Sequence, residues 1–177
     1  DPNPVIFMEH KLIYKIKGNV ELNDIPKESS MLGKANLIKE GNDMTIVAYS
    51  NMVNVAKEAI AAEELQNCSI ELIDLQTVSP IDYDTIKNSL KKTKRLLVCQ
   101  EAPSNSSVGT TVISKIVESE LFHELEVAPK LVSGLHSPMP SAKHLELNVI
   151  PQAEDITNAV KSMSVSYTHL TLPTKRI

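Results

Sequence analysis

Short apolar runs of strand length alternate with stretches of helical periodicity along most of this 177-residue chain, and this alternation constrains the fold more than any other feature. The stretches between the runs repeat apolar residues every three or four positions, which predicts amphipathic helices. Repeated strand–helix–strand units require crossover connections, so their strands form a mostly parallel sheet covered by helices on both faces. We therefore predict a three-layer α/β/α domain over residues 35–163. The predicted strands are 45–49, 70–75, 95–100 and 131–133, and the predicted helices are 52–64, 82–91, 112–121 and 154–163.

Polar side chains predict where two of the helices begin. Ser50 or Asn51 can cap the first helix and Asp82 the second, because short polar side chains accept hydrogen bonds from the free amides of a first helical turn. The apolar residues of the third helix, which include Val117, are expected to face the core.

Three segments flank this pattern. Residues 4–9 are a short apolar run that predicts a buried strand, and residues 15–34 have little periodicity and predict a linker. Residues 164–177 follow the last predicted helix without a turn signal. Within them, residues 165–174 resemble the translation of a transposase-end adapter used in DNA library preparation. We therefore predict a non-native tail and exclude it from functional reasoning.

Composition argues against several classes of partner. The net charge is −4, and no cluster of basic residues is longer than Lys91-Lys92, so nucleic acid is not expected as a partner. No apolar run reaches membrane-spanning length, and the chain opens without a charged-then-apolar leader, so a membrane is not expected either. Cys68 and Cys99 lie in apolar surroundings and predict two buried free thiols, which favours a cytoplasmic location.

The usual catalytic and nucleotide-binding motifs are missing. Five glycines cannot form a dinucleotide fingerprint or a Walker loop, and no G-x-S-x-G sequence occurs. The histidines at 10, 123, 136 and 144 do not stand at the spacing of metal ligands. We therefore assign no catalytic, cofactor-binding or metal-binding residue to this chain.

Polar loops follow three of the predicted strands, at the edge where α/β sheets place their binding sites. Residues 74–82 turn at a Ser-Pro pair, and residues 134–141 are stiffened by prolines. Glu101 follows the third strand. It could act as a general acid or contact a ligand, or it could satisfy the backbone of its loop or cap a nearby helix.

Short motifs stand in order at residues 4–14, 41–47, 74–82, 101–103, 138–140 and 150–151, with linker pieces at 17–20, 25–26 and 32–35. Taken together along residues 2–163, these motifs resemble the beta subunits of thiamine-diphosphate-dependent 2-oxo acid dehydrogenases of the pyruvate or acetoin type. The chain departs from that family's pattern at Gln76, where the family usually has Arg, and at Gln100, where it usually has His.

The resemblance implies a transketolase C-terminal-like fold and a division of labour. In the family, thiamine diphosphate and Mg²⁺ lie between an alpha subunit and the N-terminal domain of the beta subunit, and an acyl group passes to lipoamide. Residues 1–14 would then be a stub of that N-terminal domain and residues 15–34 the interdomain linker. Residues 35–163 would pair with a second beta subunit, and the fragment alone would bind no cofactor and be inactive.

The resemblance also implies a docking surface for the peripheral subunit-binding domain of the acyltransferase. Glu126, ahead of an Ala-Pro pair, matches the acidic docking residue of the family. Apart from the resemblance, Pro138, Met139 and Pro140 stand in a proline-stiffened loop that is either preorganised to contact a partner or purely structural. Glu126 could equally be a solvated residue beside Glu124. Two other functions stay open: the C-terminal domain of a transketolase or deoxyxylulose-phosphate synthase, or a free-standing non-catalytic interaction module.

Overall fold

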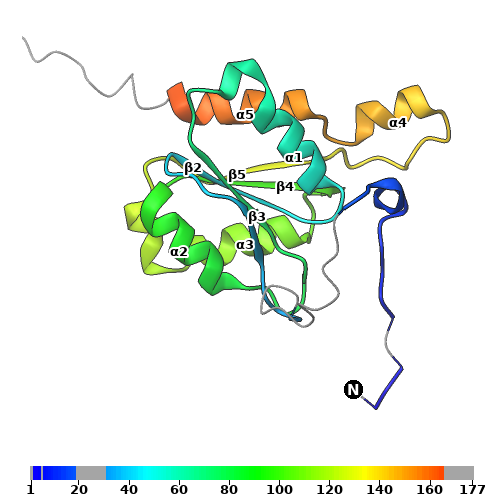
Figure 1. Cartoon of the computed structure of the whole chain (residues 1–177), viewed down its shortest axis with the longest axis horizontal. Helices are drawn as coiled ribbons and strands as arrows, with labels where there is room; N and C mark the ends of the chain where they lie inside the picture. Colours follow the sequence, from blue (N-terminus) through cyan, green and yellow to red (C-terminus); the bar gives the residue numbers. More distant parts are fainter. Residues whose placement is uncertain (1, 5, 19–30, 166–177) are drawn as a thin grey trace, which may run out of the picture.

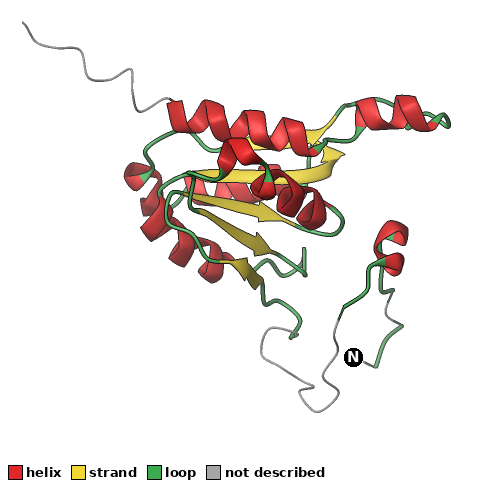
Figure 2. Cartoon of the chain, turned by 45° about the horizontal axis from the view of Figure 1, so that its top comes forward, coloured by secondary structure: helices red, strands yellow, loops and turns green. Residues whose placement is uncertain are grey.

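A five-stranded sheet runs through the middle of the molecule, with helices on both of its faces (Figures 1 and 2). The computed structural model describes residues 2–4, 6–18 and 31–165. The strand order is β1-β3-β2-β4-β5, in which β1 is antiparallel to β3 and the other neighbouring pairs are parallel. This arrangement confirms the predicted three-layer architecture. The strands are β1 (Asn36–Lys39), β2 (Met44–Ala48), β3 (Ile70–Asp74), β4 (Leu96–Pro103) and β5 (Lys130–Gly134).

Two pairs of helices form the outer layers. Helices α1 and α5 cover one face of the sheet, while α2 and α3 cover the other, and the short α4 projects to one side (Figure 1). The helices are α1 (Met52–Ala61), α2 (Tyr83–Thr93), α3 (Val108–Val117), α4 (Lys143–Val149) and α5 (Ala153–Val165). The described part of the chain also contains the short 3₁₀ helices η1 (Lys11–Lys15), η4 (Glu63–Leu65) and η5 (Glu120–Glu124).

The side chains of the central strands alternate between two cores. Ile46 of β2 packs against α1 and α5, whereas the next residue, Val47, packs against α2 and α3. Leu97 and Val98 of β4 alternate in the same way. A parallel strand that is buried on both faces is apolar along its whole length, which is why β2 and β4 were visible in the sequence. Burying one Leu or Ile side chain contributes about 1.5–3 kcal/mol, so the two cores supply most of the force that holds the helices on the sheet.

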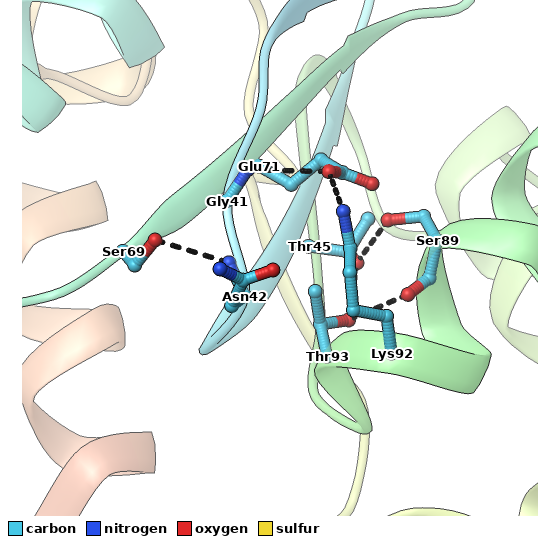
Figure 3. A network of polar contacts seen from close by, with 8 residues as sticks. All are labelled: Gly41, Asn42, Thr45, Ser69, Glu71, Ser89, Lys92 and Thr93. Carbon is cyan, nitrogen blue, oxygen red and sulfur yellow. Dashed lines mark hydrogen bonds and ion pairs between the residues drawn. The ribbon is translucent and has the colours of Figure 1, made fainter.

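A buried polar network lies between α2 and the strands β2 and β3 (Figure 3). The Glu71 carboxylate on β3 accepts hydrogen bonds from the Lys92 ammonium of α2 and from the backbone N–H of Gly41, the latter at 3.2 Å. Beside it, the Thr45 hydroxyl lies 2.6 Å from that of Ser89. Glu71 is almost fully buried, so these contacts satisfy a charge that burial alone would disfavour.

The strand predicted at residues 4–9 is wrong for the residues that the structure describes. Residues 6–10 form no regular element. The side chains of Ile6, Phe7 and Met8 are 87%, 76% and 87% exposed. An apolar run predicts burial but does not identify the element that the run packs against. In the described part of the chain, no strand of the sheet pairs with residues 6–10.

The structure corrects several smaller predictions. Asn51 precedes α1, but its side chain makes no capping hydrogen bond, whereas Asp82 caps α2 by accepting the Thr85 N–H at 3.1 Å. Val117 of α3 is 41% exposed, not buried. Strand β1 and helix α4 were not predicted at all. Helix α5 continues to Val165, two residues into the predicted tail, and residues 166–177 lie outside the described part of the chain.

Candidate functional site at the carboxyl edge of the sheet

The topology creates a switch point between β2 and β4. From β2 the chain runs through α1 to β3 on one side, and from β4 it runs through α3 to β5 on the other. Helices α1 and α3 leave on opposite faces of the sheet. Open α/β sheets bind ligands in the crevice outside the carboxyl ends of two such strands. The ends of β2 and β4 are therefore the first place to look for a site.

Glu101 of β4 lies at this switch point and contacts two side chains from distant parts of the sequence. Its Oε2 is 3.0 Å from Nε2 of His10, and its Oε1 accepts a longer contact of 3.5 Å from the Asn51 amide. Asn51 thus turns toward Glu101 instead of capping α1. Burial raises the pKa of the nearby Tyr49 hydroxyl, and the Glu101 charge raises it further. We call His10, Tyr49, Asn51 and Glu101 the carboxyl-edge cluster. Among the described residues, Glu101 therefore binds side chains, which differs from the predicted roles of backbone acceptor and helix cap.

Gln100, the residue before Glu101, ties the end of β4 to the start of α3. Its buried amide nitrogen donates to the carbonyl oxygens of Ala102 at 2.9 Å and Pro103 at 3.0 Å, and its Oε1 accepts the Gly109 N–H at 2.7 Å. A Cβ on Gly109 would lie 2.5 Å from Leu131 Cδ1 and 2.7 Å from Gln100 Oε1, so a larger residue here would require these side chains to shift. Glutamine supplies two donors and one acceptor here, whereas a neutral imidazole supplies one of each. This is the physical role of one of the two departures noted in the sequence.

The second departure, Gln76, has a different place. It follows β3 with an exposed side chain and a φ of 52°, and its N–H donates to the Asp74 carboxylate at 3.0 Å. Burial raises the pKa of Asp74 despite this bond and the nearby Lys57. Ser50 and Ser106 also have positive φ, at 57° and 47°, so a non-glycine residue in the left-handed region follows each of β2, β3 and β4. Such residues cost about 1–3 kcal/mol and gather where a fold shapes a site.

The predicted docking residues fall on opposite edges of the sheet. Glu126 lies before β5, at the amino edge, where its carboxylate pairs with Arg95 through an Nε–Oε2 distance of 3.0 Å. The Arg95 side chain is 14% exposed and that of Glu126 38%. Glu126 is therefore ion-paired and is also exposed to solvent. Pro138, Met139 and Pro140 follow β5, at the carboxyl edge, so the structure does not bring the two sets together.

The Pro138–Pro140 loop leads into an apolar region that the sequence did not reveal. The loop and α4 expose four large side chains: Leu135, Met139, Leu145 and Leu147 are between 46% and 58% exposed. A cavity of about 500 Å³ lies next to them, between β5, α4 and the start of α5. The only signal in the sequence was the run of prolines before α4.

Among the described residues, no group of three or more His, Cys, Asp or Glu side chains could hold a metal ion. Every buried side-chain nitrogen and oxygen in the described part of the chain has a hydrogen-bond partner. Within the same residues, no helix is long and apolar enough to cross a membrane.

Comparison with known proteins agrees with the fold and with the resemblance read from the sequence. The beta subunit of the pyruvate dehydrogenase E1 component from Rickettsia bellii is 39% identical over 92% of this chain and 49% of its own length. The corresponding subunit from Acholeplasma laidlawii is 36% identical over 93% of this chain and 49% of its own length. This chain spans about half the length of these curated relatives.

A solved structure and a family match complete the comparison. A split-gene transketolase, described as an inactive beta4 tetramer, superposes with a TM-score of 0.62 over 75% of this chain and 43% of its own, at 24% identity, which shows the shared fold. The family described as transketolase, C-terminal domain, matches residues 33–156. The chain therefore belongs to the transketolase C-terminal domain family and is similar along nearly all of its length to pyruvate dehydrogenase E1 beta subunits.

Proposed function

We propose that this chain is the C-terminal part of the beta subunit of a 2-oxo acid dehydrogenase that acts on pyruvate or an acetoin-type substrate. The observation that supports this best is the 39% identity to a pyruvate dehydrogenase E1 beta subunit over 92% of the chain. The names of these relatives favour this proposal over a transketolase or a deoxyxylulose-phosphate synthase. The two free cysteines fit a reducing compartment such as the cytoplasm.

In this proposal the chain supports assembly and the chemistry takes place elsewhere in the enzyme. Thiamine diphosphate and Mg²⁺ would be held by an alpha subunit and the N-terminal part of the beta subunit, which would carry out oxidative decarboxylation and acyl transfer to lipoamide. The apolar side chains exposed by the β5–α4 loop and α4, including Met139, are suited to contact a second beta subunit or the alpha subunit. Pro138 and Pro140 would hold that loop in a fixed shape before contact.

Glu126 would serve a different partner, the peripheral subunit-binding domain of the acyltransferase. It lies close to η5, which adds the exposed Glu120 and Glu124 to the same region. An acidic surface attracts a basic partner domain and speeds its association. The Arg95 guanidinium already offsets part of the Glu126 charge. The contribution of Glu126 alone to the association rate is therefore expected to be moderate.

Restoring the rest of the subunit tests the proposal. We expect the source DNA to continue upstream of Asp1 into a domain of similar size, and the completed subunit, combined with its alpha subunit, thiamine diphosphate and Mg²⁺, to oxidise pyruvate or acetoin with an artificial electron acceptor. A reading frame that begins near Asp1, or a completed and assembled enzyme without such activity, would overturn it.

Association kinetics test the docking residue. Glu126→Ala in the completed enzyme should slow association with the acyltransferase domain at low salt by roughly two- to fivefold and weaken its salt dependence. Glu58→Ala, an equal change of charge on the exposed face of α1, is the matched control. An unchanged association rate at low salt would count against docking through Glu126.

A further inference from the structure

His10 connects the start of the chain to the switch point of the sheet. We call residues 6–18 the N-terminal segment. Its His10 ring lies 3.0 Å from Glu101, which is 91 positions away in the sequence. The two side chains are 24% and 27% exposed, so both are partly withdrawn from water although the neighbouring Ile6, Phe7 and Met8 are largely exposed. Figure 2 shows η1 on the side of the molecule toward which the strand arrows point, in agreement with this contact.

The two ring nitrogens of His10 have different roles. Nδ1 accepts the Leu12 N–H at 3.3 Å, so in the neutral ring the proton must be on Nε2. That proton is then donated to the Glu101 carboxylate. The His10 carbonyl also accepts the Ile13 N–H at 3.1 Å. His10 therefore caps the start of η1 and also attaches η1 to Glu101 of β4. The formation of η1 is thus coupled to its contact with the sheet.

Charge favours the same arrangement. The N-terminal segment carries Lys11, Lys15 and Lys17 against a single acidic residue, Glu9. The Tyr14 hydroxyl donates to that Glu9, so part of its negative charge is already engaged within the segment. A segment of positive net charge is attracted to the Glu101 carboxylate on the sheet.

We propose that His10 and Glu101 form a latch that seats the N-terminal segment on the crevice between the carboxyl ends of β2 and β4. The switch point, where α/β proteins commonly bind a small ligand, is then a docking site for the chain's own N-terminal segment. Gln100 supports the latch by fixing the end of β4, which carries Glu101. This role goes beyond subunit association and does not depend on which reaction the whole enzyme catalyses.

Limited trypsin digestion of the full chain tests the latch, because cleavage after Lys11 requires η1 to detach from the sheet and unfold. His10→Ala and Glu101→Ala should each raise the rate of cleavage after Lys11 by roughly five- to tenfold, the range expected for a partly exposed hydrogen bond to a charged group. The double variant should be cut no faster than either single variant, because both changes remove the same contact. His136→Ala, a histidine on an exposed loop, is the matched control. Unchanged rates in the single variants, or effects that multiply in the double variant, would overturn the latch.

A second measurement uses the unmodified chain. It tests the latch even if Glu101→Ala destabilises the whole domain, which would show as trypsin cleavage at the lysines of α2 as well. Diethyl pyrocarbonate acylates a free imidazole nitrogen, and both nitrogens of His10 are engaged. In the unmodified chain, His10 should react at least about fivefold more slowly than the exposed His136 and His144, as measured by mass spectrometry of the peptides. Equal rates for the three histidines would overturn the latch.

Discussion

Replacing Lys92 tests the buried network between α2 and the sheet. The Glu71 side chain is 4% exposed and that of Lys92 43%, so the two partners differ greatly in how well water can replace their contact. Lys92→Met leaves a buried carboxylate without its counter-charge. Glu71→Gln leaves a half-exposed ammonium that water solvates. We therefore expect Lys92→Met to destabilise the fold more than Glu71→Gln does.

The magnitude follows from these environments. Breaking a fully buried ion pair costs about 3–5 kcal/mol, and an exposed pair contributes about 0.2–1 kcal/mol. With one partner buried and the other half exposed, we expect Lys92→Met to cost about 2 kcal/mol at pH 7 and Glu71→Gln about 1 kcal/mol. A loss of 2 kcal/mol corresponds to a fall of roughly 1 M in the urea midpoint of a domain of this size.

The dependence on pH gives a sharper test. In the native chain, burial acts to raise the pKa of Glu71, but hydrogen bonds from Lys92, Ser89 and Gly41 outweigh it and hold that pKa below its ordinary value. The stability that Glu71 contributes is therefore present above its unfolded pKa and is lost as pH falls through the lower, folded pKa. In Lys92→Met, burial dominates and the pKa should rise above the ordinary value. As the pH falls from 7 toward 5, the Glu71 carboxyl of the folded variant takes up a proton. The loss in free energy of unfolding caused by the substitution then becomes smaller.

Urea unfolding followed by circular dichroism at pH 7.5, 6 and 5 measures this difference. The free-energy gap between the native chain and Lys92→Met should shrink from about 2 kcal/mol to less than about 1 kcal/mol over that range. Lys91→Met changes the net charge by the same amount on the same exposed helix turn and should cost less than about 0.5 kcal/mol. A gap that stays constant with pH, or equals that of Lys91→Met, would refute the reasoning.

Three further substitutions or modifications follow from the packing. Gln100→Leu leaves the buried Gly109 amide and two partly exposed carbonyls at the end of β4 without their partner and should cost about 1–3 kcal/mol, measured as a lower Tm; a change below about 0.5 kcal/mol would contradict its role. Gly41→Ala would place a Cβ 2.1 Å from a backbone carbon and should destabilise the fold by at least about 2 kcal/mol, whereas Gly18→Ala, with nothing within 4 Å, should be neutral in the same urea titration. Burial raises the pKa of both thiols, and only Cys99 is fully buried, so a thiol reagent should label Cys68 slowly in the native protein and Cys99 only after unfolding; equal labelling rates would contradict this.

Burial on both faces explains which elements could be predicted. β2, β3 and β4 are buried on both sides, so their sequences are nearly continuous apolar runs that are visible without a structure. β1 is a four-residue edge strand whose exposure alternates, and so short a pattern is hard to separate from a loop. α4 has no buried residue, so its leucines do not form the stripe by which the other helices were recognised.

The candidate site was predictable only in part. The position of Glu101 at the end of a strand placed it on the carboxyl edge, because the edge follows from chain direction alone. Its partner His10 could not be found in this way, since it lies in a segment without regular periodicity and 91 positions away. Gln100 was recognised as a departure from a family pattern, but its three hydrogen bonds depend on how closely α3 approaches β4.

Residues that precede a strand and residues that follow it lie on opposite edges of the sheet, and this separates the two proposed partner surfaces. Glu126 precedes β5 and Met139 follows it, so the five-residue strand lies between them. At about 3.3 Å per residue, that strand alone spans roughly 16 Å, so the two sets lie on opposite edges of the sheet. An acidic surface beside η5 attracts a charged domain from solution, whereas exposed apolar side chains at α4 favour a permanent subunit contact. Under the proposed function, the two sets of predicted partner-binding residues therefore suit two different partners.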